Sequence, residues 1–231
     1  PKSVYAVMDT LKYFIANKTS ALVIDFFAGS GTTMHAVNLL NSIDNGHRRC
    51  IMVTNNEVSA DEAKALDEKG YRPGDKEWDR LGIARYVTWP RTVCSIKGCN
   101  IDGKPLDGNY GCNVEQYTEI EGEIVNPETG KKIRGKVYKK EKEPAYPELA
   151  DLKMSDGFKT NAVFFKLSFL DKTSVALGRQ FKELLPVLWM KGGAIGKCPA
   201  LESDELPEML ILPQNKMAVL IDEIYYSEFD V

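Results

Sequence analysis

The sequence lacks several features that identify whole classes of protein. No apolar run approaches the roughly 20 residues that cross a bilayer, and no stretch has the layout of a secretory signal peptide. The five cysteines are an odd number without a pairing framework, which is typical of a reducing compartment. No internal repeat or low-complexity segment is present. These absences argue against a membrane, secreted or solenoid protein, and they predict a cytoplasmic location.

A strong charge of either sign is also missing. The 30 Lys and Arg residues nearly balance the 33 Asp and Glu residues, and the net charge is −3. Such a balance does not indicate a nucleic-acid-binding protein, although it can hide a local basic patch. The hydrophobic share of 43% and the charged share of 27% are ordinary for a globular protein. A chain of 231 residues is long enough for one large domain or for a domain with an appendage.

Helices and strands alternate through the first region of the chain, residues 1–93. Apolar spacing and turn signals predict a helix over 3–16, a strand over 21–25, a helix over 34–40, a strand over 49–54 and a helix that begins at the capping box Ser59–Glu62. This alternation predicts an α/β fold, in the form of a Rossmann-like domain half with a parallel, doubly wound sheet.

Two further regions follow. Residues 94–148 are rich in Gly, Pro, Asn and Asp, and they predict a β-rich arm or insertion. Its hairpin is expected from strands 123–125 and 132–138 around a turn at 126–130. Residues 149–231 predict a C-terminal α/β subdomain with a buried strand at 161–169, a helix through Leu177–Leu188, and a hairpin of strands 209–212 and 217–221.

The most informative stretch joins the first predicted strand to the helix that follows. It reads Asp25-Phe26-Phe27-Ala28-Gly29-Ser30-Gly31-Thr32-Thr33. Its glycines allow a tight turn and let a ligand approach the backbone. The helix then presents unpaired N–H groups to whatever lies above the turn. A strand, an acid, a glycine turn and a helix in this order predict a pocket for a nucleotide-like ligand.

Three ligand classes use such a turn. A nucleoside triphosphate is disfavoured because no lysine follows Gly31, as a P-loop requires. A dinucleotide is disfavoured because Met34 stands where the third glycine of Gly-x-Gly-x-x-Gly belongs. S-adenosylmethionine remains, since Asp25 suits its cationic end and the glycines leave room for its methionine part.

A second acid follows the second predicted strand. Glu57 is placed to accept hydrogen bonds from ribose hydroxyls, a task that Asn55 or Asn56 can share. The structural alternative is that Asp25 only caps the next helix and that the glycines only make a turn. The ordered set of strand, acid, glycine pair, helix, strand and acid favours the cofactor interpretation.

The glycine turn resembles the cofactor-binding motif of DNA methyltransferases that modify the exocyclic amino group of adenine or cytosine. The order of segments is most similar to that of modification subunits of type III restriction systems, in which the catalytic half precedes the cofactor-binding half. Residues 1–93 carry the resemblance best. Weaker likenesses lie in Pro1–Val4, where Ser3 replaces the proline of a Lys-Pro segment, in residues 84–91, and in Gly157-Phe158-Lys159.

The resemblance implies that the chain is the C-terminal, S-adenosyl-L-methionine-binding part of an adenine-specific DNA methyltransferase. The cofactor-binding residues that it implies are Lys2, Asp25, Phe26, Phe27, Ala28, Gly29, Gly31, Thr32 and Glu57. The family's catalytic motif, Asp-Pro-Pro-Tyr or a close variant, is absent, so we expect no catalytic residue here and no activity from the chain alone. The implied partners are double-stranded DNA, bound by the full-length protein, and a second copy in a homodimer or a restriction subunit.

Other motifs carry weaker signals. Cys94, Cys99 and Cys112 have no fourth ligand nearby, so free thiols and no metal are expected. His35 is expected to be a surface or packed residue rather than a catalytic one, and a buried strand is expected to account for the aromatic residues of 158–169 better than stacking on bases does. Basic residues crowd the predicted hairpin: Lys131, Lys132, Arg134, Lys136, Lys139, Lys140 and Lys142. They suit either contacts to DNA phosphates or the protection of an exposed strand edge.

Two other functions compete with the methyltransferase interpretation. The chain can instead be a DNA-docking or subunit-assembly module whose cofactor site is vestigial. A nicotinamide-dependent oxidoreductase is the third hypothesis, and Met34 argues against it.

Overall fold

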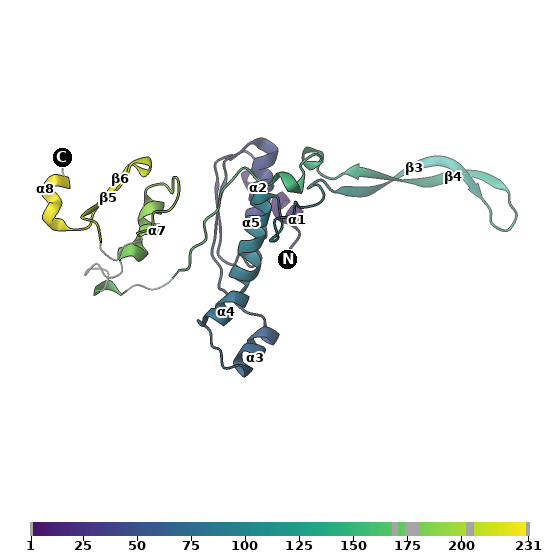
Figure 1. Cartoon of the computed structure of the whole chain (residues 1–231). Helices are drawn as coiled ribbons and strands as arrows, with labels where there is room; N and C mark the ends of the chain where they lie inside the picture. The colour runs from purple at the N-terminus through teal and green to yellow at the C-terminus, as the bar shows by residue number, and fades with distance from the viewer. Residues whose placement is uncertain (1, 168–170, 174–180, 202–205, 230–231) are drawn as a thin grey trace. The chain divides into compact units, whose positions relative to one another are not determined.

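The computed structural model describes residues 2–167, 171–173, 181–201 and 206–229 (Figure 1). The chain divides into two compact units, Pro1–Phe164 and Phe165–Val231, and each is described by itself. The region boundaries expected at 93/94 and 148/149 stay predictions. No helix in the described part of the chain is long and apolar enough to cross a membrane.

The first unit begins with a run of helices and strands in the predicted order. Its elements are α1 (Val4–Ile15), β1 (Leu22–Asp25), α2 (Thr32–Asp44) and β2 (Arg49–Met52). The two strands are parallel, with Asp25 opposite Met52 at their carboxyl ends. The mixed α/β character and the parallel pairing are therefore confirmed.

The Rossmann-like, doubly wound sheet is not demonstrated. The β1–β2 sheet has two strands in the described part of the chain. Leu22, Ile24, Ile51 and Val53 are each at least 40% exposed, so one face of this sheet is uncovered. Doubly wound sheets carry helices on both faces. Within the described residues, neither further strands nor a second helical layer cover this face.

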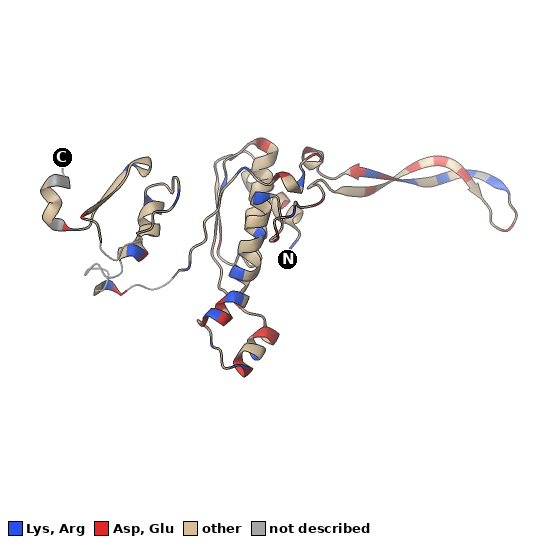
Figure 2. Cartoon of the chain, viewed as in Figure 1, with Lys and Arg blue, Asp and Glu red and all other residues tan. Residues whose placement is uncertain are grey.

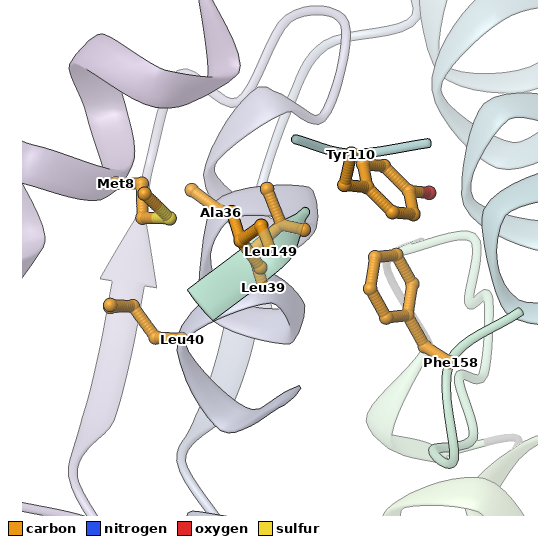
Figure 3. Close-up of a cluster of buried hydrophobic side chains, with 7 residues drawn as sticks. All are labelled: Met8, Ala36, Leu39, Leu40, Tyr110, Leu149 and Phe158. Carbon is orange, nitrogen blue, oxygen red and sulfur yellow. The ribbon is translucent and has the colours of Figure 1, made fainter. Parts of the chain in front are cut away.

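Helices α1 and α2 pack together around the main hydrophobic core of the first unit. The buried side chains of this core are Met8, Ala36, Leu39, Leu40, Tyr110, Leu149 and Phe158 (Figure 3). Ala36, Leu39 and Leu40 follow the spacing of an apolar stripe on one face of α2. Tyr110, Leu149 and Phe158 come from much later in the sequence, so residues from all three predicted regions share one core.

Short helices follow β2. They are α3 (Ala60–Glu68), α4 (Lys76–Leu81), a π-helical turn η1 (Ala84–Thr88) and α5 (Trp89–Lys97). The predicted cap of α3 is confirmed, because the Glu62 backbone N–H donates to Ser59 Oγ at 3.4 Å. The Glu62 carboxylate accepts the Ser59 hydroxyl at 2.6 Å rather than a backbone N–H. The cap therefore forms with one backbone bond and one side-chain bond.

Two glycines allow the end of α5 to cross a later segment. That segment holds the 3₁₀ turns η2 (Pro147–Leu149) and η3 (Met154–Asp156). Gly98 ends α5 at φ +67°, and Gly157 follows η3 at φ +63°. A Cβ on Gly98 would overlap the Ser155 backbone, and one on Gly157 would overlap the Ile96 carbonyl. The Phe158 N–H donates to that carbonyl at 3.2 Å, so Gly157 permits the approach and Phe158 enters the core.

The expected arm is a long antiparallel hairpin of β3 (Asn113–Val125) and β4 (Lys132–Pro144), drawn as a two-stranded ribbon in Figure 1. The turn at 126–130 is confirmed, and the Asn126 side chain accepts the Glu128 N–H there at 2.9 Å. Both strands are longer than predicted. Side chains on both faces of β3 are exposed, so the ribbon does not pack against the core of its unit.

The second unit contains α7 (Phe181–Lys191), β5 (Met209–Leu212), β6 (Met217–Leu220), and short turns at η4 (Pro213–Asn215), η5 (Glu223–Tyr225) and α8 (Tyr226–Phe229). The predicted hairpin is confirmed by the antiparallel pairing of β5 with β6. The predicted helix is confirmed over α7, whereas Leu177 lies outside the described residues. Phe181, Leu185 and Trp189 are the buried side chains of α7.

The buried strand expected at 161–169 is wrong over residues 161–167. These residues form no strand, and Leu167 is 93% exposed. Residues 168 and 169 lie outside the described part. Phe164 instead packs against Trp89, and Phe165 packs against Trp189. The apolar run therefore supplies one ring contact in each unit, and among the described residues it pairs with no strand.

Candidate functional site

The glycine turn lies at the carboxyl end of β1, beside the end of β2. The Val53 N–H donates to the Asp25 carbonyl at 2.8 Å, and the Ala28 N–H donates to the Val53 carbonyl at 3.3 Å. The Gly31 N–H then donates to the Ala28 carbonyl at 2.9 Å and closes the turn. Gly29 and Gly31 have φ values of +50° and +76°, in the left-handed region that favours glycine. The backbone of the turn is thus tied to both parallel strands.

The Asp25 carboxylate braces the turn from within. Its Oδ1 accepts the Phe27 N–H at 3.1 Å, and its Oδ2 accepts the Thr33 hydroxyl at 2.6 Å. Neither bond comes from a backbone N–H of α2, so Asp25 braces the turn and the Thr33 side chain rather than capping the helix. A carboxylate has about four acceptor positions, so a ligand contact remains compatible with both bonds. Direct binding of a cofactor by Asp25 stays a prediction.

The two glycines face different surroundings. A Cβ on Gly31 would lie 3.0 Å from the Thr88 methyl carbon and 3.5 Å from Cε of Met52. A Cβ on Gly29 would meet only the Phe27 carbonyl oxygen, at 3.9 Å. Gly31 therefore permits close approach by the protein itself, whereas the space beside Gly29 is open.

Two residues beyond the turn hold it in place, and the sequence assigned neither of them a role. The Thr88 hydroxyl donates to the carbonyl of Gly29. Arg91 Nη1 lies 3.2 Å from the Ser30 carbonyl and 3.0 Å from Thr32 Oγ1, and it donates to both. The available sequence signal was their spacing, because residues three apart lie on one face of a helix.

The predicted site residues fall into two groups. Asp25 to Thr32 form one continuous turn, in which Ala28 and Thr32 are buried, while Phe26 and Phe27 are 66% and 90% exposed. Lys2 and Glu57 are exposed, and among the described residues no hydrogen bond or ion pair joins either side chain to the turn. The Glu57 carbonyl accepts the Ile83 N–H at 2.8 Å. Their roles in cofactor binding stay predictions.

His35 lies one turn into α2, behind the glycine turn, and it is packed as expected. Its ring meets the rings of Tyr110 and Phe158 edge to face, each at 5.3 Å between centroids. Its Nε2 shares a hydrogen bond with the Tyr110 hydroxyl at 3.1 Å. Burial, and to a lesser extent the positive charge of Arg91, lower the pKa of His35 to about 4. The imidazole is therefore neutral at physiological pH.

The structure bears on two weaker sequence signals, the cysteines that suggested a metal site and the basic hairpin that suggested a contact with DNA. All five cysteines are free, and the described residues contain no cluster suited to a metal ion. The hairpin carries both blue and red in Figure 2, since its seven basic residues are matched by seven acidic ones: Glu115, Glu119, Glu121, Glu123, Glu128, Glu141 and Glu143. Its ion pairs are Lys132–Glu123, Lys136–Glu119, Lys139–Glu141 and Lys140–Glu115, at 2.5 to 2.8 Å. This balance of charges favours the interpretation in which the charged side chains protect the exposed strand edges from pairing with other chains. The contact with DNA stays a prediction.

Comparison with known proteins adds two partial relatives. The chain is 45% identical over 56 residues to the type II methyltransferase M.KpnI of Klebsiella pneumoniae, and the matched segment is 24% of this chain and 13% of that protein. It is 44% identical over 72 residues to the Mod subunit of the type III restriction-modification enzyme EcoPI of Escherichia phage P1, which covers 31% of this chain and 11% of that subunit. No protein-family model matches the chain. The chain thus has partial, distant similarity to DNA methyltransferases of restriction-modification systems.

Proposed function

We propose that this chain is the cofactor-binding portion of a site-specific DNA methyltransferase, which transfers a methyl group from S-adenosylmethionine to the exocyclic amino group of adenine. The observation that carries the proposal is the turn from Asp25 to Thr33, which lies at the carboxyl ends of two parallel strands and has open space beside Gly29. Ligands of open α/β sheets bind at this edge. The partial similarity to two methyltransferases supports the choice of a methyl donor.

The residues of the turn suit this cofactor chemically. The carboxylate of Asp25 attracts the cationic end of the ligand, and the bare backbone at Gly29 leaves room for its methionine part. The exposed rings of Phe26 and Phe27 offer apolar surface beside the turn. Glu57 supplies acceptors for the ribose hydroxyls. The bound cofactor supplies an electrophilic methyl group, and this chain contributes binding and orientation.

Double-stranded DNA is the proposed substrate of the whole protein. A second copy or a restriction subunit is the proposed protein partner. The matched segments span only 13% and 11% of the two relatives, and the Asp-Pro-Pro-Tyr motif is absent from this sequence. We therefore propose that another part of the protein presents the target base.

Calorimetry tests the proposal directly. The chain is titrated with S-adenosylmethionine and with S-adenosylhomocysteine, and Asp25→Ala is expected to weaken binding about tenfold, equivalent to about 1.4 kcal/mol. Gly29→Val fills the open side of the turn and also strains its backbone, whose φ is +50°, so it is expected to weaken binding at least as much, and urea unfolding checks that the variant is folded. Asp102→Ala removes an exposed loop acid and serves as the control. The proposal fails if neither this chain nor a protein that joins it to the proposed catalytic part binds either compound at millimolar concentration.

The second candidate function is a DNA-docking or subunit-assembly module with a vestigial cofactor site. The observation in its favour is the exposed hairpin, whose strand β4 carries most of the basic residues. Charge reversal at Lys131, Lys132, Lys139 and Lys140 is expected to abolish a salt-sensitive affinity for duplex DNA. A flat titration of the unchanged chain at low salt would rule this candidate out.

A further inference from the structure

Two side chains outside the glycine turn form hydrogen bonds to the stretch that contains both of its glycines. Thr88 bonds to the carbonyl of Gly29, and Arg91 bonds to residues on both sides of Gly31. The bonded partners are 59 to 61 positions apart in the sequence. We propose that Thr88 and Arg91 are positioning residues, which hold the glycine turn in the shape that admits the cofactor. This inference rests on the proposed function and extends it to residues that do not touch the ligand.

The turn needs such support because glycine has more conformational freedom than any other residue. Gly29 and Gly31 both adopt left-handed backbone conformations, and together they leave the turn many alternatives when it is free. Ordering a loop at the moment of binding weakens affinity, and a preformed loop avoids that cost. Contacts that order the turn in advance therefore strengthen cofactor binding without contacting the cofactor.

Thr88 and Gly31 fit together as a pair. Thr88 is only 6% exposed, and its methyl carbon lies 3.0 Å from where a Cβ on Gly31 would be. The missing side chain at Gly31 therefore lets the π-helical turn η1 approach closely enough for the Thr88 hydroxyl to reach Gly29. The same hydroxyl lies 3.1 Å from the carbonyl of Ile83, the residue that precedes η1. Thr88 thus links the backbone of η1 to the backbone of the turn.

Arg91 holds the other half of the turn. Its Nη1 donates to the Ser30 carbonyl and to Thr32 Oγ1, and it lies 3.3 Å from Ser30 Oγ. Thr32 is buried at the first position of α2. Arg91 therefore ties the start of α2 to α5, and the guanidinium fixes Ser30 relative to Thr32. Charge-assisted hydrogen bonds of this kind are stronger than neutral ones.

Matched variants separate the hydrogen bonds from simple packing. Thr88→Val keeps the methyl group and removes the hydroxyl, whereas Thr88→Ser keeps the hydroxyl and removes the methyl group. Arg91→Met removes the charge and the donors, whereas Arg91→Lys keeps a cationic donor. Arg85→Met is the control, because Arg85 lies in the same π-helical turn but its guanidinium stacks on Phe164 at 5.2 Å.

Two measurements on the full chain complete the test. Calorimetry is expected to show cofactor affinity about tenfold lower in Thr88→Val and Arg91→Met, with Thr88→Ser, Arg91→Lys and Arg85→Met near the unchanged chain. Hydrogen exchange is expected to be at least about tenfold faster at the Ala28 and Gly31 amides in the same two variants, because those amides close the turn. Exchange at Leu39 in α2 reports whether each variant remains folded.

The outcomes distinguish this inference from the proposed function. If the unchanged chain binds no cofactor, the proposed function is in question, while the exchange rates still decide whether Thr88 and Arg91 hold the turn. Unchanged exchange at Gly31 in both folded variants would overturn the inference. Equal cofactor affinity of Thr88→Val and Thr88→Ser would overturn it as well. A loss of affinity in Arg85→Met equal to that in Arg91→Met would show a general effect of η1 and α5 and would also overturn it.

Discussion

Gly29 and Gly31 lie two positions apart in one turn, yet the space beside each of them is different. The absence of a side chain at Gly31 makes room for Thr88 and Met52, whereas Gly29 borders open space. A substitution at Gly31 therefore disturbs the packing of the protein as well as any ligand. A Cβ at Gly29 meets only a carbonyl oxygen at ordinary contact distance, but a φ of +50° strains any other residue there, so a Gly29 variant needs a check of folding beside its binding measurement.

His35 makes the stability of the first unit depend on pH. Its pKa is lowered from an unfolded value near 6.5 to about 4, and among the described residues its buried Nδ1 has no hydrogen-bond partner. Between these two values the unfolded chain binds more protons than the folded one, so the free energy of unfolding falls as the pH falls. We expect the titration of His35 to lower the free energy of unfolding by about 2 kcal/mol between pH 7 and pH 5.

Urea unfolding at the two pH values measures this loss. His35→Phe keeps a ring beside Tyr110 and Phe158 but does not titrate, so the variant is expected to lose about 2 kcal/mol less than the unchanged chain over the same range. The second histidine, His47, is exposed and is present in both proteins. Equal losses in the two proteins would contradict the prediction.

Among the elements, α1 and α2 are joined at their carboxyl ends by one buried arginine. The Arg48 side chain is fully buried, it donates to the carbonyls of Ile15 and Ala16, and it pairs with both oxygens of Asp44 at 2.7 and 2.9 Å. These bonds satisfy carbonyl groups that the end of α1 leaves open. The side-chain hydrogen bond from Arg48 also holds the pKa of Asp44 below its usual value.

Arg48→Met is expected to lower the free energy of unfolding by about 3 kcal/mol, because it leaves the Asp44 carboxylate and the α1 carbonyls without their donor. Arg49→Met changes the adjacent, exposed arginine and is expected to stay within about 0.5 kcal/mol of the unchanged chain. Denaturant unfolding of both variants makes the comparison. Equal stability of the two would show that the buried bonds of Arg48 do not stabilise the helix pair.

The β3–β4 hairpin is expected to be dispensable for folding. Within the described residues each of its strands pairs only with the other, and β3 is exposed on both faces. Glu119 and Tyr138 face each other across the ladder, so residues 120–137 can be replaced by a two-residue Asn-Gly turn. We expect this deletion to move the melting temperature by less than about 2 °C. A fall of more than about 5 °C would mean that the arm contributes to the core of its unit.

At the scale of the whole molecule, we predict that the chain binds the methyl donor but does not transfer the methyl group. The reason is the absent Asp-Pro-Pro-Tyr motif, whose counterpart in the resembling family holds the target amine. Incubation with DNA and radiolabelled S-adenosylmethionine is expected to leave the DNA unlabelled. Addition of a polypeptide that carries the proposed catalytic part is expected to restore labelling. Labelling of DNA by this chain alone would contradict the assignment of catalysis to another part of the protein.

Much of the local structure was predictable because it depends on neighbours in the sequence. Apolar spacing predicted α1, α2 and α7, and the turn residues predicted the β3–β4 and β5–β6 hairpins. The failure at 161–167 has the same origin, since an apolar run describes a strand or an irregular segment equally well until a pairing partner is known. The roles of Thr88, Arg91 and Arg48 were not predictable, because their partners are set by packing.

The sequence by itself determined the order of strand, acid, glycine turn and helix, and hence the class of ligand that we propose. Those features act over a few residues, where backbone freedom and helix capping decide the outcome. Only the tertiary structure decided that Gly31 faces Thr88 while Gly29 faces open space, and that glutamates neutralise the lysines of the hairpin. The physical reason is distance along the chain: Thr88 lies 59 positions from Gly29, and no local pattern records which distant segments will pack together.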